Sequence, residues 1–142
     1  MINYGRVALA AVVSTVVYFA YGFLVEGLLI RNDFAPYSLV YRSPETMRPY
    51  MPLGLASIVI AIFVIAIIYA KGYEGGSGAA EGARFGFLLG VFVVFAFAGV
   101  NYAVLNVGRK IAVMTAAAGF VEWLAIGVVI GLVYRPAPGS PR

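Results

Sequence analysis

The sequence contains no cysteine and no histidine. Without thiols or imidazoles the chain cannot form disulfides, and its own side chains offer no Fe–S cluster, no ordinary zinc site and no His-ligated haem. The same absence removes two of the commonest nucleophiles and general bases of enzymes. Charged residues are scarce as well, at 11% of 142 residues. We therefore expect no metal, no cofactor and no catalytic activity, and nothing in the sequence predicts nucleic-acid binding.

Hydrophobic residues are abundant by contrast, at 63% of the chain with a mean hydropathy of +0.95. Four apolar runs are long enough, as helices rising roughly 1.5 Å per residue, to cross a hydrocarbon layer about 30 Å thick. The runs are continuous, whereas strands of a membrane barrel are shorter and alternate in polarity. We predict helical spans at residues 7–30, 53–70, 85–105 and 111–134.

The connections between these spans are too short for a second domain. We predict an all-α integral membrane protein, a four-helix bundle formed by residues 1–135 with both termini on the same side. The Pro-rich tail at 136–142 should be disordered. Lys and Arg divide equally between the two sides, so the positive-inside rule leaves the orientation open, and the free amino group favours cytoplasmic termini. The terminal side has Arg6, Lys71, Arg84, Arg135 and Arg142, and the other side has Arg31, Arg42, Arg48, Arg109 and Lys110.

The first connection, residues 31–52, is the longest and mixes Tyr and Phe with Arg. This composition is typical of a segment at the level of the lipid headgroups, and a lid or docking surface is the alternative. Ser43, Pro44 and Glu45 predict a helix start, with Ser as the N-cap and Pro at the first helical position. Pro49 and Pro52 should then break or kink that helix.

The other two connections are simpler. Residues 71–86 are rich in glycine but lack the order of residues that defines a phosphate-binding loop. We predict a flexible turn there, followed by a helix start near Ala79. Residues 106–110 form so short a link that the third and fourth spans must be antiparallel neighbours.

Small residues mark the helix faces that we expect to pack, because helices in lipid associate where their backbones approach closely. Gly82, Gly86 and Gly90 form such a stripe on the third span. At about 100° per residue, three further residues share its face and should also be buried. These are Val93, Phe97 and Asn101.

The fourth span has two distinct faces. Gly127 and Gly131 lie about 140° and 180° around the helix from Glu122. If the glycines pack on one neighbour, Glu122 faces elsewhere. The helix must then lie between protein on two sides, or one of these faces must contact another subunit.

Two acids fall inside the predicted spans, Glu26 and Glu122. Glu122 lies about 18 Å along its helix from Lys110, close to the bilayer midplane, and Glu26 lies near the edge. The depth difference of roughly 10 Å argues against a hydrogen-bonded pair of carboxyl groups. Tyr18 shares a helix face with Glu26, and Asn101 lies at an intermediate depth. The predicted polar site is therefore Tyr18, Glu26, Asn101 and Glu122.

The state of Glu122 follows from its depth. An ionised carboxylate at the midplane costs about 3 kcal/mol, and no Lys or Arg lies within a predicted span to pair with it. We expect Glu122 to be protonated at neutral pH and to donate a hydrogen bond to Asn101 or to a backbone carbonyl. It could either join helices in this neutral form or exchange a proton, while Glu26 can reach the interface.

Over most of its length the chain resembles a group of small bacterial four-span membrane proteins of unknown function, and three segments carry the resemblance. They are YGFLVEGLLIRNDF at the end of the first span, KGYEGGSGAAEGARFG in the second connection and GFVEWLAIGVVIGLVYRP in the last span. The resemblance implies a four-helix bundle, and the bacterial inner membrane as its location. It implies no activity and no site residue.

Three functions remain open from the sequence. The first is a non-catalytic accessory or structural subunit of a larger membrane complex, or a helix-packing module that binds lipid. The second is an oligomeric small-solute or proton-coupled transporter that uses Glu122. The third, an enzyme or redox helper acting on a lipid or quinone, would have to work without His or Cys. Expected partners are membrane lipids and either other transmembrane subunits or further copies of the chain.

Overall fold

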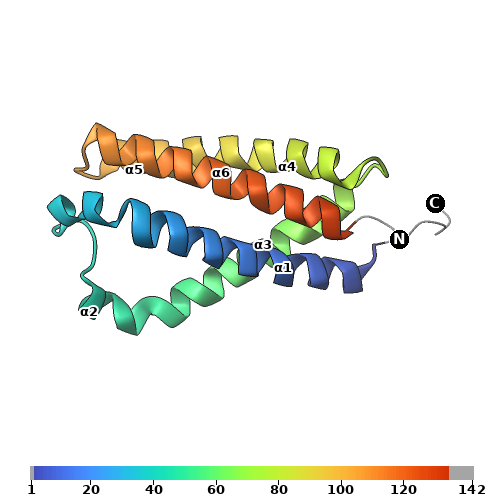
Figure 1. Ribbon diagram of the computed structural model, residues 1–142, viewed down its shortest axis with the longest axis horizontal. Helices are drawn as coiled ribbons and strands as arrows, with labels where there is room; N and C mark the ends of the chain where they lie inside the picture. Colours follow the sequence, from blue (N-terminus) through green and yellow to red (C-terminus); the bar gives the residue numbers. More distant parts are fainter. Residues whose placement is uncertain (1, 135–142) are drawn as a thin grey trace.

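The computed structural model describes residues 2–134, which form helices and no strand (Figure 1). Four helical stretches are long and apolar enough to cross a membrane, so the all-α four-span prediction is confirmed. They are Tyr4–Leu29, Pro44–Gly72, Gly78–Val104 and Arg109–Tyr134. The first begins and the last ends at the same end of the bundle (Figure 1). The predicted tail at 136–142 lies outside the described residues.

Each span contains regular and irregular helix. The first is α1 (Tyr4–Gly22) followed by the π-helix η1 (Phe23–Leu29), and the second is mainly α3 (Met51–Gly72). The third joins α4 (Gly78–Val93), the π-helix η4 (Val94–Gly99) and α5 (Val100–Val104), and the fourth is α6 (Arg109–Tyr134). The third span begins seven residues earlier than its predicted start at 85, because the small residues from Gly78 onward already form helix.

The first connection contains the predicted helix start. After a 3₁₀ segment, η2 (Arg31–Tyr37), the chain enters α2 (Pro44–Met47), and the Ser43 hydroxyl accepts a hydrogen bond from the Thr46 backbone N–H at 3.4 Å. Pro49 lies in a 3₁₀ turn, η3 (Arg48–Tyr50), and Pro52 in the first turn of α3. The two prolines therefore produce a tight turn without ending the helical stretch.

The closest helix pair is α4 with α6, which lie side by side along their length (Figure 1). Gly82, Gly86 and Gly90 are buried there, as are Gly127 and Gly131 on α6. A Cβ on Gly86 would lie 2.5 Å from the carbonyl oxygen of Leu124, closer than atoms approach. All five glycines predicted to mark packing faces therefore lie where α4 and α6 approach most closely.

The opposite face of α6 packs on α1, and α1 in turn contacts α3. Ile126 and Ile130 of α6 meet Val7, Ala10 and Ala11 of α1 in a core that Ile62 and Ala66 of α3 complete. Helix α6 therefore lies between α4 and α1. Of the two arrangements considered from the sequence, this is the one in which protein of the same chain covers both faces of the helix. No second subunit is needed to cover Glu122.

Helix α3 stays close to α1 only over part of its length. Toward α2 the two helices diverge (Figure 1), and every residue from 51 to 57 is exposed. On the facing arm Phe23, Leu24, Leu28 and Leu29 are exposed as well. We call this region the fork, with residues 23–29 as one arm and residues 51–57 as the other.

The two π-helical segments change which residues face the core. A π-turn holds about one residue more than an α-turn, so each segment rotates the residues after it by roughly 100°. Every residue from 99 to 104 is exposed, so this end of the third span has no buried face at all. Phe97, inside η4, is exposed too, and the prediction that Phe97 and Asn101 continue the buried glycine face is wrong. Val93 precedes η4 and lies against Gly119 as expected, at 3.4 Å from the position of a Cβ there.

Candidate functional site

Glu122 is buried at the interface between α6 and α1, with 7% of its surface exposed. It lies in the middle of α6, and its Oε1 atom is 3.8 Å from where a Cβ of Gly22 would be. Gly22 therefore leaves space for the carboxyl group where a larger side chain would fill it. Within residues 2–134 the carboxyl has no hydrogen bond and no ion pair. The expected hydrogen bond to Asn101 or a backbone carbonyl is absent from this arrangement.

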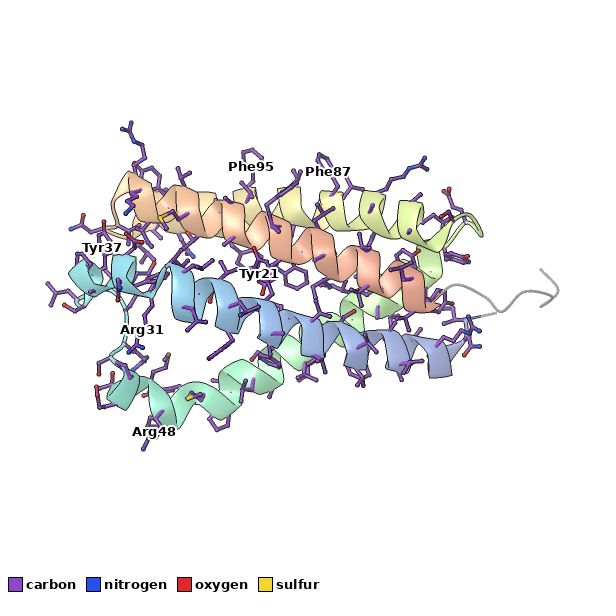
Figure 2. All side chains as sticks on the ribbon, in the orientation of Figure 1. Tyr21, Arg31, Tyr37, Arg48, Phe87 and Phe95 are labelled. Carbon is purple, nitrogen blue, oxygen red and sulfur yellow. The ribbon has the colours of Figure 1, made fainter. Side chains whose placement is uncertain are left out.

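Two tyrosines of α1, Tyr18 and Tyr21, come shortly before Gly22 in sequence, and both approach α6. The ring of Tyr18 is 6.0 Å from that of Trp123, centroid to centroid. The hydroxyl of Tyr21 donates a 3.0 Å hydrogen bond to the carbonyl oxygen of Ala118, one turn before Glu122 (Figure 2). The Tyr18 and Tyr21 hydroxyls both interact electrostatically with Glu122.

Glu26 is the other acid of the predicted site. It lies in η1 and is exposed, yet its carboxyl still interacts electrostatically with that of Glu122 and with both tyrosines. No hydrogen bond joins the two carboxyl groups, in agreement with their different predicted depths. The structure thus brings together Tyr18, Glu26 and Glu122, three of the four predicted residues.

Asn101 is not part of this cluster. It lies in α5, after the π-helix η4, and its side chain is exposed. The prediction placed it on the glycine face by counting α-helical turns through residues 94–99. That prediction is wrong because residues 99–104 are exposed on every side of the helix, so no buried face continues to Asn101.

Sequence reasoning placed Gly22 on the helix face of Tyr18 and Glu26, and it missed two further residues, Ser14 and Tyr21. Ser14 is completely buried, and its hydroxyl has no hydrogen-bond partner. It lies one turn before Tyr18 and two before Gly22, so the spacing that grouped Tyr18 with Glu26 also identifies it. Tyr21 lies off that spacing, and only its contact with Ala118 across the interface reveals its role.

A second polar pair lies at the opposite end of the bundle. The Tyr69 hydroxyl and the Oε2 atom of Glu81 are both buried without a hydrogen-bond partner, although the two groups interact electrostatically. The Oε1 atom of Glu81 accepts a 2.7 Å hydrogen bond from the Gly76 backbone N–H. Glu81 was assigned to a connection from the sequence, and the structure places it in the first turn of α4 instead.

The chemistry available to the α1–α6 site is limited. Among the described residues no three acids are gathered in a way that could hold a metal ion. What remains is a buried carboxyl group next to tyrosine hydroxyls, a group that can bind or release a proton and can accept a hydrogen bond.

Four spans with an acid inside them define the class of this chain, a multi-pass integral membrane protein. Comparisons with protein-family models, with curated proteins and with solved structures gave no match.

Proposed function

We propose that this protein is a non-catalytic integral membrane protein that binds membrane lipid in the fork between α1 and α3. The observation that supports this most directly is the exposure of every residue from 51 to 57, two full turns of a helix whose other end is packed in the core. Apolar side chains that this chain leaves exposed within a membrane contact either lipid acyl chains or a helix of another protein.

The side chains of the fork favour an acyl chain. Where helices of this protein meet closely, Gly and Ala form the contact, as in the α4–α6 pair. The fork exposes Gly54, Ala56 and Ser57 beside large flexible side chains, among them Phe23, Leu28, Met51 and Leu53. Such walls adapt to lipid tails better than to the backbone of another helix. An accessory role in a larger complex, in which a partner's helix fills the fork, is the competing outcome.

Fluorescence quenching tests this proposal, since the chain has one tryptophan. In a Trp123→Phe background, a Leu55→Trp reporter placed in vesicles with acyl-brominated phosphatidylcholine should be quenched as strongly as a Leu88→Trp reporter on the exposed face of α4. If Leu55→Trp escapes quenching in the native membrane extract while Leu88→Trp does not, a protein occupies the fork and the proposal fails.

A second candidate function rests on Glu122. An intramembrane acid without a partner is costly, and a proton-coupled role would explain why this one is kept beside Gly22, Tyr18 and Tyr21. On this hypothesis, Glu122→Gln keeps the side chain's shape and most of its hydrogen-bonding ability but cannot titrate. Proton uptake by the reconstituted protein, followed with a pH-sensitive dye, should fall to background in Glu122→Gln.

The matched control for that experiment is Glu74→Gln, which changes an exposed acid in the second connection, outside the α1–α6 site. Equal proton uptake by wild type and Glu122→Gln would exclude the proton-coupled function. The folded state of both variants is checked by circular dichroism, because a neutral glutamine at the α1–α6 interface should leave the helices assembled.

A further inference from the structure

We propose that protons reach Glu122 from one side of the membrane only, through Glu26, at the end of the bundle that holds the first and third connections. This rests on the proton-coupled function proposed for Glu122 and adds the route by which that group is protonated. The route follows the α1–α6 interface, which leads to an exposed acid at one end and is sealed by an apolar core at the other.

Toward the first connection, no packed layer separates Glu122 from the surface of the bundle. Gly22 leaves space beside the carboxyl group, whose Oε1 atom is 3.8 Å from the position of a Cβ there. None of the residues from 23 to 29 is buried. Glu26, one turn after Gly22, is itself exposed. An acid near the edge of the membrane can reach the aqueous interface with its carboxyl group.

The polar groups in this part of the interface interact with one another. The carboxyl group of Glu26 interacts electrostatically with that of Glu122, and the hydroxyls of Tyr18 and Tyr21 each interact with both carboxyl groups. Within residues 2–134 no titratable group of α3 or α4 interacts with Glu122. The Tyr21 hydroxyl also donates its 3.0 Å hydrogen bond to the Ala118 carbonyl, which holds the two helices together here (Figure 2).

In the other direction, where α1 begins and α6 ends, the same interface is closed. Six residues of α1, α3 and α6 are completely buried in its core: Ala10, Ala11, Ile62, Ala66, Ile126 and Ile130. Close-packed apolar side chains leave no room for water and offer no group that can hold a proton. Ser14 adjoins this core, and its buried hydroxyl has no hydrogen-bond partner that could continue a route.

Proton transfer along the open part needs only the two carboxyl groups and a hydroxyl or water between them. Water at the interface protonates the carboxylate of Glu26. A tyrosine hydroxyl or a water molecule then accepts that proton as it donates its own to the carboxylate of Glu122. Glu26 returns to its ionised form, so one proton has moved and no other bond has changed.

The test is a rapid drop in pH applied to the protein in lipid nanodiscs, where both faces of the membrane meet the same solution. Protonation of Glu122 is followed by the infrared absorption of its neutral carboxyl group, assigned as the band that Glu122→Gln removes. In Glu26→Gln the band should still form, but slower by about tenfold or more, because a positioned proton carrier is lost. Glu26→Asp keeps a carboxyl group and should restore most of the rate.

The matched controls are Ser14→Ala on the sealed side and Glu74→Gln outside the interface, and both should keep the wild-type rate. A wild-type rate in Glu26→Gln overturns the route while leaving the proton-coupled function intact. Equal slowing in Ser14→Ala and Glu26→Gln overturns the sealed side. If no band in wild type depends on Glu122, the proton-coupled function itself fails. Circular dichroism checks that the helices of each variant remain assembled.

Discussion

Gly82, Gly86, Gly127 and Gly131 determine how closely α4 and α6 approach. A Cβ on Gly82 would lie 2.5 Å from the carbonyl oxygen of Gly127, and one on Gly127 would overlap the backbone of Gly86. In each case the obstacle is backbone, which cannot rotate away as a side chain can. The helix pair is therefore specified by the absence of side-chain atoms at a few positions.

Gly127→Val should destabilise the protein more than a typical substitution, because the added side chain forces the helices apart. We expect a loss of at least about 2 kcal/mol, at the upper end of the usual cost of overpacking. Denaturation in mixed micelles, followed by circular dichroism, measures it. Gly54→Val is the matched control, since nothing lies within 4 Å of a Cβ there, and it should change stability by less than about 0.5 kcal/mol. Comparable losses in both variants would contradict this account.

At this same scale the sequence was informative about Glu122 and less so about its neighbours. Angles around an ideal helix correctly separated Glu122 from Gly127 and Gly131, because α6 is regular throughout. The same arithmetic failed for Phe97, which lies within the π-helix η4, and for Asn101, which lies in a stretch exposed on every side, residues 99–104. No local pattern in residues 94–99 distinguishes a π-turn from an α-turn. The extra residue in the turn becomes visible only in the packing.

At the scale of elements, the first and third connections are fastened to each other. The Tyr37 hydroxyl accepts a 3.1 Å hydrogen bond from the Gly108 backbone N–H, and Lys110 pairs with Asp33. The Lys110 side chain is 75% exposed, so the ion pair adds little to stability. The partly buried hydrogen bond matters more, because its loss leaves a backbone donor without an acceptor.

Tyr37→Phe should loosen the third connection without disturbing the spans. We expect a loss of about 1 kcal/mol and faster hydrogen–deuterium exchange at Gly108 and its neighbours. Tyr41→Phe removes an exposed hydroxyl and serves as the control. Unchanged exchange at Gly108 in Tyr37→Phe would mean that the hydrogen bond does not hold the connection in place.

The outlines of the elements were largely predictable because span length, capping residues and turn residues act locally. The Ser43 cap and the short link between the third and fourth spans are examples. The divergence of α3 from α1 was not predictable, since lipid provides little drive for apolar helix faces to close on one another. The apolar sequence of residues 53–57 suits a contact with another helix of this chain as well as a contact with lipid. The sequence therefore does not reveal which of the two packs against them.

At the scale of the whole molecule, the bundle is a series of helix pairs in which each pair shares one helix with the next. Helix α4 contacts α6, α6 contacts α1, and α1 contacts α3, with only minor contact between α3 and α6. The two candidate sites are at different joints of this series. Glu122 lies within the α1–α6 joint, and the fork lies where the α1–α3 joint opens. A change in how α3 lies against α1 can alter the fork while leaving Glu122 enclosed.

The central place of α6 has a consequence for biosynthesis. Helix α6 leaves the ribosome after the other three described spans, so it enters a membrane where they are already inserted. Until then α4 lacks its main packing partner and α1 is covered by α3 alone. Assembly of the four spans must therefore wait for α6, and the glycine face of α4 is exposed to lipid and to the insertion machinery in the meantime.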